Sequence, residues 1–448
     1  MSVIRKGYSR QMLRIGGVLM VVVTLFWQTQ ISYALGNASS ERVTAATITD
    51  SLHIGNVVPT WGQQIPKLVY DGKWYYAASL DGEMYNYPWD GKIFKSPDGV
   101  NWSLAAQFNN QTTYQPPGLL LDYKGDLHMQ VGCYGYADKP CFPGFQTNGT
   151  GAVSYHHVVF NNRLADGSFD FSTFADHSVM NSPFYYMGTA VDKTGRYIYT
   201  AYADDVWDLH LAVFDVKKND YIVQKVIVTP PSNRAWLYPK VQPGNKPGEV
   251  SILTGQYVLG SPNSAVYDDV FYLNSTDFGQ TWSSPQLVTH VDNPNGYERW
   301  VDATDLAIDA HGQIHMLYFE KSDGNPDNEL WYKEGINGSP VGLGKLDNHA
   351  QLKIAPNGER FIFTSEGAGL AVYRSTDGVQ WSKEYYPVDH VQSIFWPTLV
   401  EKSNGSKTKP HEVKMIVAGQ VSGSNAFSHL LMLTYSWSPN QQGNNEAE

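Results

Sequence analysis

The sequence predicts an all-β protein made of repeated four-stranded sheets. An apolar strand, a turn with Gly or Asn and a second apolar strand recur seven times along the 448 residues. Further short strands follow most copies, and no long segment has helical periodicity. Repeated sheets of this length, with no helices between them, indicate a β-propeller.

The spacing of the copies predicts the number of blades. The anchors lie 51, 71, 51, 64, 47 and 47 residues apart, at Pro66, Pro117, Gly188, Pro239, Ala303, Ala350 and Pro397. Seven anchors predict seven blades, and six is the alternative, because one irregular copy could be an insertion. A ring of blades closes when one terminus completes the sheet of the other. The segment VTAATIT, 43–49, is expected to add to the last blade.

The two ends are expected to lie outside the propeller. Four basic residues precede an apolar run of 13 residues, 15–27, which is short for a membrane span. Ser32, Tyr33 and Ala34 place small residues where a signal peptidase reads. We therefore expect a signal peptide over 1–34, one propeller domain over 41–438 and a polar tail over 439–448. An uncleaved N-terminal anchor that leaves the protein facing outside is the alternative.

Charge and cysteine content limit the kinds of partner and cofactor that we expect. Without residues 1–34 the chain has 28 basic and 43 acidic residues, a net charge of −15, and no Lys or Arg block. This charge balance argues against a nucleic-acid partner. After cleavage of the signal peptide, we expect a monomer without a membrane span. Cys133 and Cys141 are expected to form a disulfide in an exported chain. No cofactor is expected; the acidic loop 322–329 is a solvated loop or, alternatively, a Ca²⁺ site.

Three short stretches predict a special hairpin turn inside a blade. They read STDFGQTW from Ser275, SPDGVNW from Ser96 and STDGVQW from Ser375, and an apolar strand enters each. An Asp at the start of a turn accepts hydrogen bonds from backbone N–H groups further on. Gly adopts a positive φ that a Cβ resists, and Trp folds back to bury apolar surface. Turn chemistry therefore explains every position, and a catalytic cluster is not needed.

These turns resemble the Asp-box, or BNR repeat, of the sialidase superfamily. The stretch at Ser275 fits S-x-D-x-G-x-T-W, the other two fit a form one residue shorter, and a degenerate fourth copy is expected at LADGSF, 164–169. The resemblance implies a propeller whose boxes lie on the rim away from the active face. In sialidases an Arg before Ile-Pro binds the sugar carboxylate, whereas Gln64 precedes Ile65-Pro66 here. This departure argues against a true sialidase, and secreted polysaccharide lyases and other glycan-active proteins share the general pattern.

The candidate site is expected just before the innermost strand of each copy. Nearly every copy supplies an aromatic side chain there, and most add a hydrogen-bonding one. Such a surface suits sugars, although the same aromatic residues could instead fill the cores between blades. The residues expected to bind substrate are Gln64, Tyr114, Tyr186, Trp236, His349 and Trp396.

The segment YERWVDATD, 297–305, supplies the catalytic candidates. In a glycosidase Asp302 would be one of two carboxylates, with Asp204 or Asp205 as its partner. In a lyase Arg299 would neutralise a uronate, with Tyr238, Tyr186 or His349 as the base. A structural salt bridge is the alternative role for Arg299.

The sequence thus predicts a secreted, carbohydrate-active propeller that cleaves glycosidic bonds of a polysaccharide by hydrolysis or elimination. The catalytic set is Asp302, Arg299 and Tyr238. The alternative is a propeller that binds a glycan or a surface without catalysis. His128 and His315 stand at equivalent positions of two copies, which indicates packing rather than catalysis or a metal site.

Overall fold

The computed structural model describes most of the chain between residues 42 and 438. The described residues are 42–52, 60, 62, 64–82, 89–112, 116–134, 153–177, 184–259, 266–291, 300–321, 328–346, 349–402, 411–421 and 427–438. They belong to one compact unit, Glu41–Glu448. These residues form strands and turns without a helix, which confirms the all-β prediction. The described part of the chain therefore holds no helix long and apolar enough to cross a membrane.

Four sheets have the simplest possible topology. Each contains four strands that are consecutive in the chain, and neighbours pair antiparallel. The first two sheets are β10(Phe184–Val191), β11(Tyr197–Asp204), β12(Leu209–Asp215) and β13(Asp220–Val228), then β14(Arg234–Pro243), β15(Val250–Val258), β16(Val266–Ser275) and β17(Gln286–His290). The next two are β18(Trp300–Ile308), β19(Ile314–Lys321), β20(Asn328–Glu334) and β21(Val341–Leu346), then β22(Ala350–Ile354), β23(Arg360–Glu366), β24(Gly369–Ser375) and β25(Ser382–Pro387). These are the repeated sheets that the hairpin pattern predicts.

The remaining strands join one 12-stranded sheet, which has two narrow connections. β26 pairs with β2 in parallel over three residues, and β5 pairs with β7 only through Thr112 and Cys133. The N-terminal strands are β2(Leu68–Tyr70), β3(Tyr75–Asp81), β4(Trp89–Ser96), β5(Ser103–Thr112), β6(Gly118–Leu121), β7(Leu127–Tyr134), β8(Val153–Phe160) and β9(Ala175–Asp176). The C-terminal strands are β26(Ser393–Lys402), β27(Glu412–Gln420) and β28(Phe427–Ser436), and β1(Arg42–Thr49) pairs with β28.

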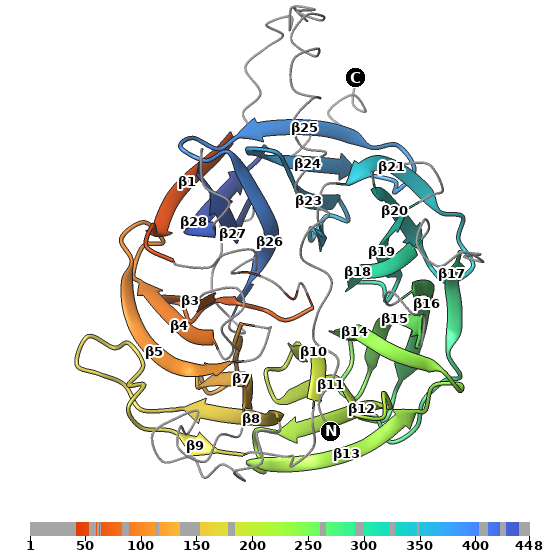
Figure 1. Ribbon diagram of the computed structural model, residues 1–448, viewed down its shortest axis with the longest axis horizontal. Helices are drawn as coiled ribbons and strands as arrows, with labels where there is room; N and C mark the ends of the chain where they lie inside the picture. The colour runs from red at the N-terminus through yellow and green to blue at the C-terminus, as the bar shows by residue number, and fades with distance from the viewer. Residues whose placement is uncertain are drawn as a thin grey trace, which may run out of the picture. The chain divides into compact units, whose positions relative to one another are not determined.

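The strand β1 closes the structure. It pairs antiparallel with β28 from Arg42 to Thr49, so the N-terminal end of the described chain completes the last sheet, as predicted for VTAATIT. The first strands of successive groups, β2, β6, β10, β14, β18, β22 and β26, contact one another in chain order, and β26 contacts β2. The groups therefore surround a common centre, as Figure 1 shows, which is the arrangement of a propeller.

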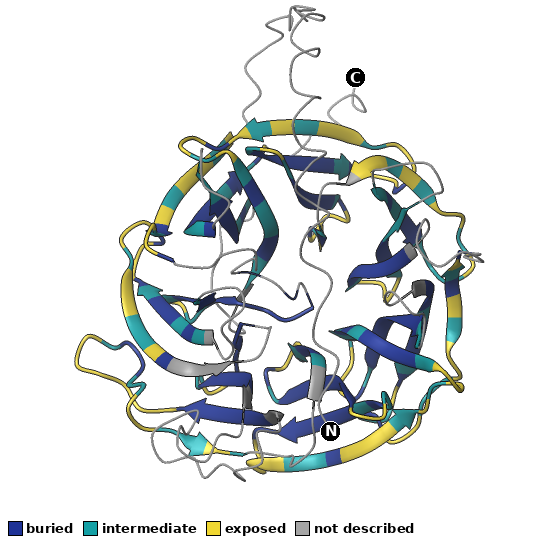
Figure 2. Cartoon of the chain, viewed as in Figure 1, coloured by how far each residue is buried: buried dark blue, intermediate teal, exposed yellow. Residues whose placement is uncertain are grey.

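The core lies between the faces of successive sheets. Every residue of β11 is buried, whereas the outermost strands β13 and β25 are largely exposed (Figure 2). One core cluster joins Tyr199 and Leu211 of one sheet to Trp236 and Ile252 of the next. Burying both faces of the middle strands explains why they read as nearly continuous apolar runs.

The turn STDFGQTW closes the hairpin from β16 to β17, as predicted. The Ser275 Oγ accepts a hydrogen bond from the Gly279 N–H at 2.9 Å, and Asp277 Oδ1 accepts one from Thr281 N–H at 2.9 Å. Gly279 has φ 81°, and the Trp282 Nε1–H donates to the Gly279 carbonyl at 3.0 Å. The turns at Ser96 and Ser375 repeat the contact from Gly N–H to Ser Oγ at 2.8 Å. Below, "box turns" means these three turns.

Several predictions from sequence fall outside the described residues. They are the signal peptide 1–34, the tail 439–448, Cys141 with the side chain of Cys133, and residues 322–327 of the acidic loop. The LADGSF stretch is described: it forms a turn in which Asp166 Oδ1 accepts the Ser168 N–H at 2.7 Å.

Candidate functional site

The ends of the first strands lie opposite the box turns. Each box turn joins the third strand of a sheet to the fourth, whereas a first strand begins at the other end of the same antiparallel sheet. The connection between the second and third strands lies at that end too, as Asp204–Leu209 does between β11 and β12. Loop residues from two places in the chain can therefore meet there, and we call this end the loop face.

In three of the sheets, the first strand has a bulge a few residues after its start, and the bulge holds an aromatic residue at positive φ. The residues are Tyr186, Tyr238 and Trp396, with φ of 49°, 50° and 52°. The strand register shifts at each of them, so each residue belongs to a β-bulge. A bulky residue in the left-handed region is uncommon, and its strain of about 1–3 kcal/mol persists only where surrounding contacts hold it. Such strain points to a functional position.

Two of these residues form part of an aromatic cluster. The rings of Tyr186 and Tyr238 lie 4.3 Å apart at an interplanar angle of 45°. Trp207, from the loop Asp204–Leu209, has φ 69° and meets Tyr257 edge-on at 5.8 Å. All four pack against the same small core of Ala235 and Leu237. We call Tyr186, Trp207, Tyr238 and Tyr257 the aromatic cluster; its flat faces suit the C–H faces of sugar rings.

An aspartate–histidine pair lies at the same end of β11 and β12. His210 and Tyr202 are direct cross-strand partners, and their rings stack at 5.0 Å and 11°. The His210 Nε2 lies 2.9 Å from Asp204 Oδ2. Asp204 Oδ1 accepts hydrogen bonds from the backbone N–H groups of Val206 at 3.0 Å and Asp208 at 2.8 Å. The carboxylate is therefore fixed, and it fixes the imidazole in turn.

This geometry determines which nitrogen of His210 can take up a proton. An ionised carboxylate only accepts hydrogen bonds, so His210 Nε2 carries the hydrogen and Nδ1 of the neutral ring has the lone pair. The imidazole is 16% exposed and the carboxylate 12%, so the pair is reachable but mostly shielded. Burial raises the pKa of Tyr202, followed in size by the charge of Asp204, so the phenol keeps its proton. Tyr202 is 2% exposed, so it supports the face of the imidazole from below.

A second charged group on the loop face involves Arg234. Its guanidinium donates to both oxygens of Asp268, at 2.7 and 2.8 Å, and to Asp269 Oδ2 at 2.8 Å. Asp269 Oδ1 lies 2.6 Å from His290 Nδ1. Burial raises the pKa of Asp268, and the hydrogen bond from Arg234 opposes the rise. Both carboxylates are thus committed to one cation, which suits a structural role better than catalysis.

The structure describes two of the three catalytic candidates from sequence, Asp302 and Tyr238. Asp302 is 6% exposed, lies near Gly255, and accepts the Ala303 N–H at 2.8 Å. Burial raises the pKa of Asp302 well above its usual range. Tyr238 belongs to the aromatic cluster. Arg299 lies outside the described residues, as does the substrate-binding candidate Tyr114.

The other substrate-binding candidates divide between surface and interior. Trp236 is 2% exposed and packs edge-on to Phe271 at 5.3 Å in the core between sheets, which is the core-filling role considered from sequence. His349 and Trp396 meet edge to face at 4.7 Å. Gln64 is 1% exposed, and neither atom of its amide has a hydrogen-bond partner. Tyr186 lies in the aromatic cluster, so the structure brings Tyr186 to Tyr238 and His349 to Trp396.

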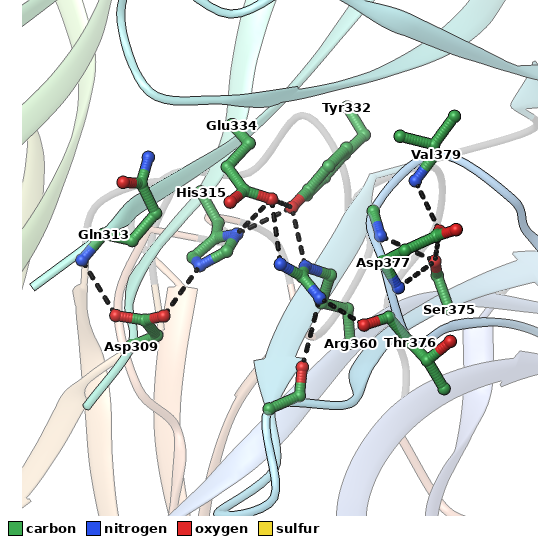
Figure 3. A network of polar contacts seen from close by, with 12 residues as sticks. Asp309, Gln313, His315, Tyr332, Glu334, Arg360, Ser375, Thr376, Asp377 and Val379 are labelled. Carbon is green, nitrogen blue, oxygen red and sulfur yellow. Dashed lines mark hydrogen bonds and ion pairs between the residues drawn. The ribbon is translucent and has the colours of Figure 1, made fainter. Parts of the chain in front are cut away.

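We call the end of the sheets that carries the box turns the turn end. The buried histidines there are packing groups. Figure 3 shows His315 between Asp309 and Tyr332, with its Nδ1 2.6 Å from the Tyr332 hydroxyl. Arg360 donates to Glu334 at 2.9 Å and to the carbonyl of Thr376, inside a box turn, at 2.9 Å. The contact of His128 with Asp122, at 3.2 Å, repeats the pattern in another copy. The repetition supports the packing interpretation, and in the described part of the chain no three His, Cys, Asp or Glu residues gather as a metal site.

His210, Trp207 and Tyr257 were not singled out from the sequence. The stretch YADDVWDLH, 202–210, contains both partners of the pair, six residues apart. Their proximity depends on a hairpin loop that returns His210 beside Tyr202. An Asp before a short loop and a His at the start of the next strand is the only local signal, and it is too common to identify a site.

Solved structures of similar fold come from polysaccharide lyases. No protein-family model matches the sequence, and neither does any curated protein. An ulvan lyase described as a new polysaccharide lyase family, PL25, aligns with 86% of this chain and 93% of its own, at 14% identity and a TM-score of 0.57. The same lyase bound to the saccharide GlcA(1–4)Rha3S aligns at 14% identity over 87% of this chain and 94% of its own, with a TM-score of 0.59. Polysaccharide lyase Uly1 aligns at 10% identity over 88% of this chain and 99% of its own, with a TM-score of 0.57. At these identities the likeness establishes the fold.

Proposed function

We propose that this protein is a secreted propeller that cleaves an acidic polysaccharide by β-elimination at the loop face. The observation that carries the proposal is the fixed pair Asp204–His210 on the loop face, stacked on Tyr202, at the loop that also carries Trp207 of the aromatic cluster. Secretion follows from the leader 1–34, with cleavage near Ala34. Mass measurement of the exported protein tests that step, because the mature chain should begin at residue 35.

We further propose seven blades of the sialidase-superfamily type. The closed series of first strands runs through β2, β6, β10, β14, β18, β22 and β26, and each of these strands is the first of a four-strand group once β1 is added to β26–β28. The two narrow connections of the 12-stranded sheet divide it into three such groups. The hydrogen bonds of the box turns are those that the Asp-box pattern requires of its Ser, Asp and Gly.

The chemistry of elimination needs what this site offers. A base removes the C5 proton of a uronate; the electron pair forms the C4–C5 double bond as the C4–O bond breaks, and an acid protonates the departing oxygen. His210 Nδ1 is the proposed base, since Asp204 holds the proton on Nε2. Tyr202 is buried beneath the ring, so solvent water is the proposed proton donor to the departing oxygen. The acidity of the C5 proton depends on a cation at the uronate carboxylate, and Arg299 stays the sequence candidate for that role.

The similar lyase structures support this choice over hydrolysis. One of them holds a saccharide that contains glucuronic acid, a uronate with the required C5 proton. Hydrolysis is the second candidate, because the pKa of Asp268 is raised as a general acid requires, with Asp269 beside it. The commitment of both carboxylates to Arg234 makes this candidate weaker. Glycan binding without catalysis is the third outcome that the experiment separates.

The test is a panel of acidic and neutral polysaccharides with two readouts. Ultraviolet absorbance detects the unsaturated uronate that only elimination leaves, and reducing ends report cleavage by either route. We expect both signals on a uronate-containing polymer and loss of both in His210→Gln. His311→Gln, in an exposed turn at the opposite end of β18, is the matched control and should keep full activity. Reducing ends without absorbance would replace elimination by hydrolysis, and binding without either signal would leave a glycan-binding propeller.

A further inference from the structure

A fully buried lysine lies just ahead of β2, the first strand of the group β2–β5. Lys67 is 0% exposed and precedes β2. Its ammonium donates to the carbonyl oxygens of Gly62 and, at 3.1 Å, of Ile65. These carbonyls belong to one turn, which the contact from Ile65 N–H to Gly62 carbonyl closes at 3.3 Å. Two of the three ammonium hydrogens are thus used, and neither partner carries a charge.

The charges near Lys67 do not balance it. Lys240 is a neighbouring cation whose charge, after burial, helps to lower the pKa of Lys67. Asp305 neutralises Lys240 at 2.9 Å, and its oxygens also accept the N–H groups of Leu306 at 2.8 Å and Leu352 at 2.7 Å. Asp305 is therefore saturated by Lys240 and the backbone. In the described part of the chain no carboxylate is paired with Lys67, so burial of its charge has no compensation.

Unpaired polar atoms accompany this charge. Gln64 lies in the same 62–65 turn, is 1% exposed, and has no partner for either its Nε2 or its Oε1. His349 Nδ1 is also buried without a partner, and burial followed by the positive charge of Lys67 lowers the pKa of His349 to about 3. Each unsatisfied buried group costs about 1–3 kcal/mol, so such groups rarely persist without a bound water, ion or ligand. Gln64 thus belongs to the turn whose carbonyls hold the Lys67 ammonium, and His349 is within reach of the charge of Lys67.

We propose that Lys67, Gln64 and His349 form a buried site for a small inorganic anion such as a halide. An anion would accept the third ammonium hydrogen of Lys67, an N–H of Gln64 and the Nδ1–H of neutral His349. The complete burial of Lys67 excludes the carboxylate of a polysaccharide, which cannot leave its chain. The site is thus separate from the glycan site proposed above and serves to hold the turn ahead of β2 in place.

Bromide is the probe, because it scatters anomalously and is small enough for a buried site. A crystal of the full mature protein grown or soaked in bromide should show an anomalous peak in contact with Lys67 Nζ and Gln64 Nε2. Ordered water at that position without anomalous signal would overturn the proposal. This measurement needs no variant, so it decides the question even if substitutions at the site prevent folding.

Thermal unfolding gives an independent solution test. Sodium bromide is exchanged for sodium gluconate at constant ionic strength, since gluconate is too large for a buried site. We expect bromide to raise the midpoint of unfolding by roughly 2–4 °C through preferential binding to the folded state. Equal midpoints in the two salts would contradict the site.

Gln64→Glu tests the geometry of the site. A carboxylate in place of the amide supplies the missing negative charge, so the midpoint should become independent of bromide. Gln392→Glu adds the same charge at an exposed position and should keep the wild-type response to bromide. A Gln64→Glu protein that folds and still responds as the wild type does would rule out Gln64 as a ligand. The glycan panel reports cleavage and the bromide measurements report the buried site, so failure of either proposal can be told from failure of the other.

Discussion

The turn end and the loop face of the sheets differ in which residues hold a left-handed backbone. Glycine holds such a position in each box turn, with φ of 76°, 81° and 75° at Gly99, Gly279 and Gly378, and Phe278, beside Gly279, is the one bulky residue of the three box turns that shares it, with φ 62°. On the loop face Tyr186 and Tyr238 hold φ near 50°. Glycine would relax these bulges too, yet large aromatic side chains stand there.

The two ends also differ in how their polar side chains are hydrogen-bonded. The Ser and Asp side chains of the box turns all accept backbone N–H groups, and Arg360 and Glu334 tie a box turn to its neighbour. Ahead of β2, by contrast, neither atom of the Gln64 amide has a hydrogen-bond partner. The Ser and Asp side chains of the box turns are thus satisfied within a few residues. Unpartnered buried atoms occur at both ends, since Trp102 Nε1 and His315 Nε2 at the turn end also lack a partner. The loop face is distinguished by its strained aromatic residues, as expected of a functional surface.

The largest expected effect is on catalysis, from Asp204→Asn. An amide at this position can donate to the imidazole, which favours the tautomer with its hydrogen on Nδ1 and removes the proposed base. We expect kcat on the cleaved polysaccharide to fall by roughly 10²–10⁴-fold with little change in stability.

Asp205→Asn is the matched control for that variant. Asp205 lies in the same loop, is exposed, and should tolerate the change with activity near wild type. A loss with Asp205→Asn and not with Asp204→Asn would refute the proposed pair. It would favour the hydrolase arrangement, in which Asp205 was one of the carboxylates considered.

The next effect is on stability, at the turn end. Gly279→Ala places a Cβ at φ 81° and 2.3 Å from Leu211 Cδ2. Backbone strain and overpacking together should lower the free energy of unfolding by roughly 2–4 kcal/mol, measured in urea. The specific activity of the folded protein should not change, because the loop face is untouched.

Gly344→Ala separates the two contributions. Gly344 has φ 93°, and a Cβ there meets nothing within 4 Å, so only the backbone strain of about 1–2 kcal/mol applies. Equal losses for the two variants would show that the contact with Leu211 adds nothing.

A smaller effect is expected from Tyr238→Gly on the loop face. Glycine removes the strain at φ 50° and also removes the ring that packs on Tyr186. We expect KM for the polysaccharide to rise roughly 5–10-fold, while relief of strain offsets most of the lost packing. Tyr123→Gly, at an exposed turn position on the opposite end, should leave KM unchanged. A large loss of stability with unchanged KM would assign Tyr238 to packing alone.

The smallest effect concerns acid stability of a box turn. Hydrogen bonds from the Thr281 side chain and backbone lower the pKa of Asp277. Because the folded pKa is depressed, this carboxylate contributes stability above its unfolded pKa of about 4, and the contribution is lost as pH falls toward the folded value. Asp277→Asn should therefore flatten the decline in the unfolding midpoint below about pH 4. Asp389→Asn, at an exposed turn position, should keep the wild-type slope, and identical slopes for all three proteins would contradict the account.

The scaffold could be predicted because its signals are local. Each hairpin carries its own turn chemistry, as Ser275, Asp277 and Gly279 do within five residues. The recurrence of that hairpin implied a closed ring of sheets, and β1 pairs with β28 as the closing strand should. Equivalent placement in two copies likewise predicted a packing role for His128 and His315, and their contacts with Asp122 and Asp309 agree with it.

The sequence by itself therefore determined the all-β repeat, the role of STDFGQTW and the expected position of the site at the start of the first strands. Only the tertiary structure decided which residues act together there. Trp236 and Tyr238 are two residues apart, yet one fills the core and the other joins the aromatic cluster, because a bulge changes the direction of the strand between them. Burial likewise raised the pKa of Asp302 and left Lys67 hydrogen-bonded to carbonyl groups that carry no charge. Turn chemistry is encoded within a few residues, whereas burial and the meeting of side chains depend on how separate sheets pack.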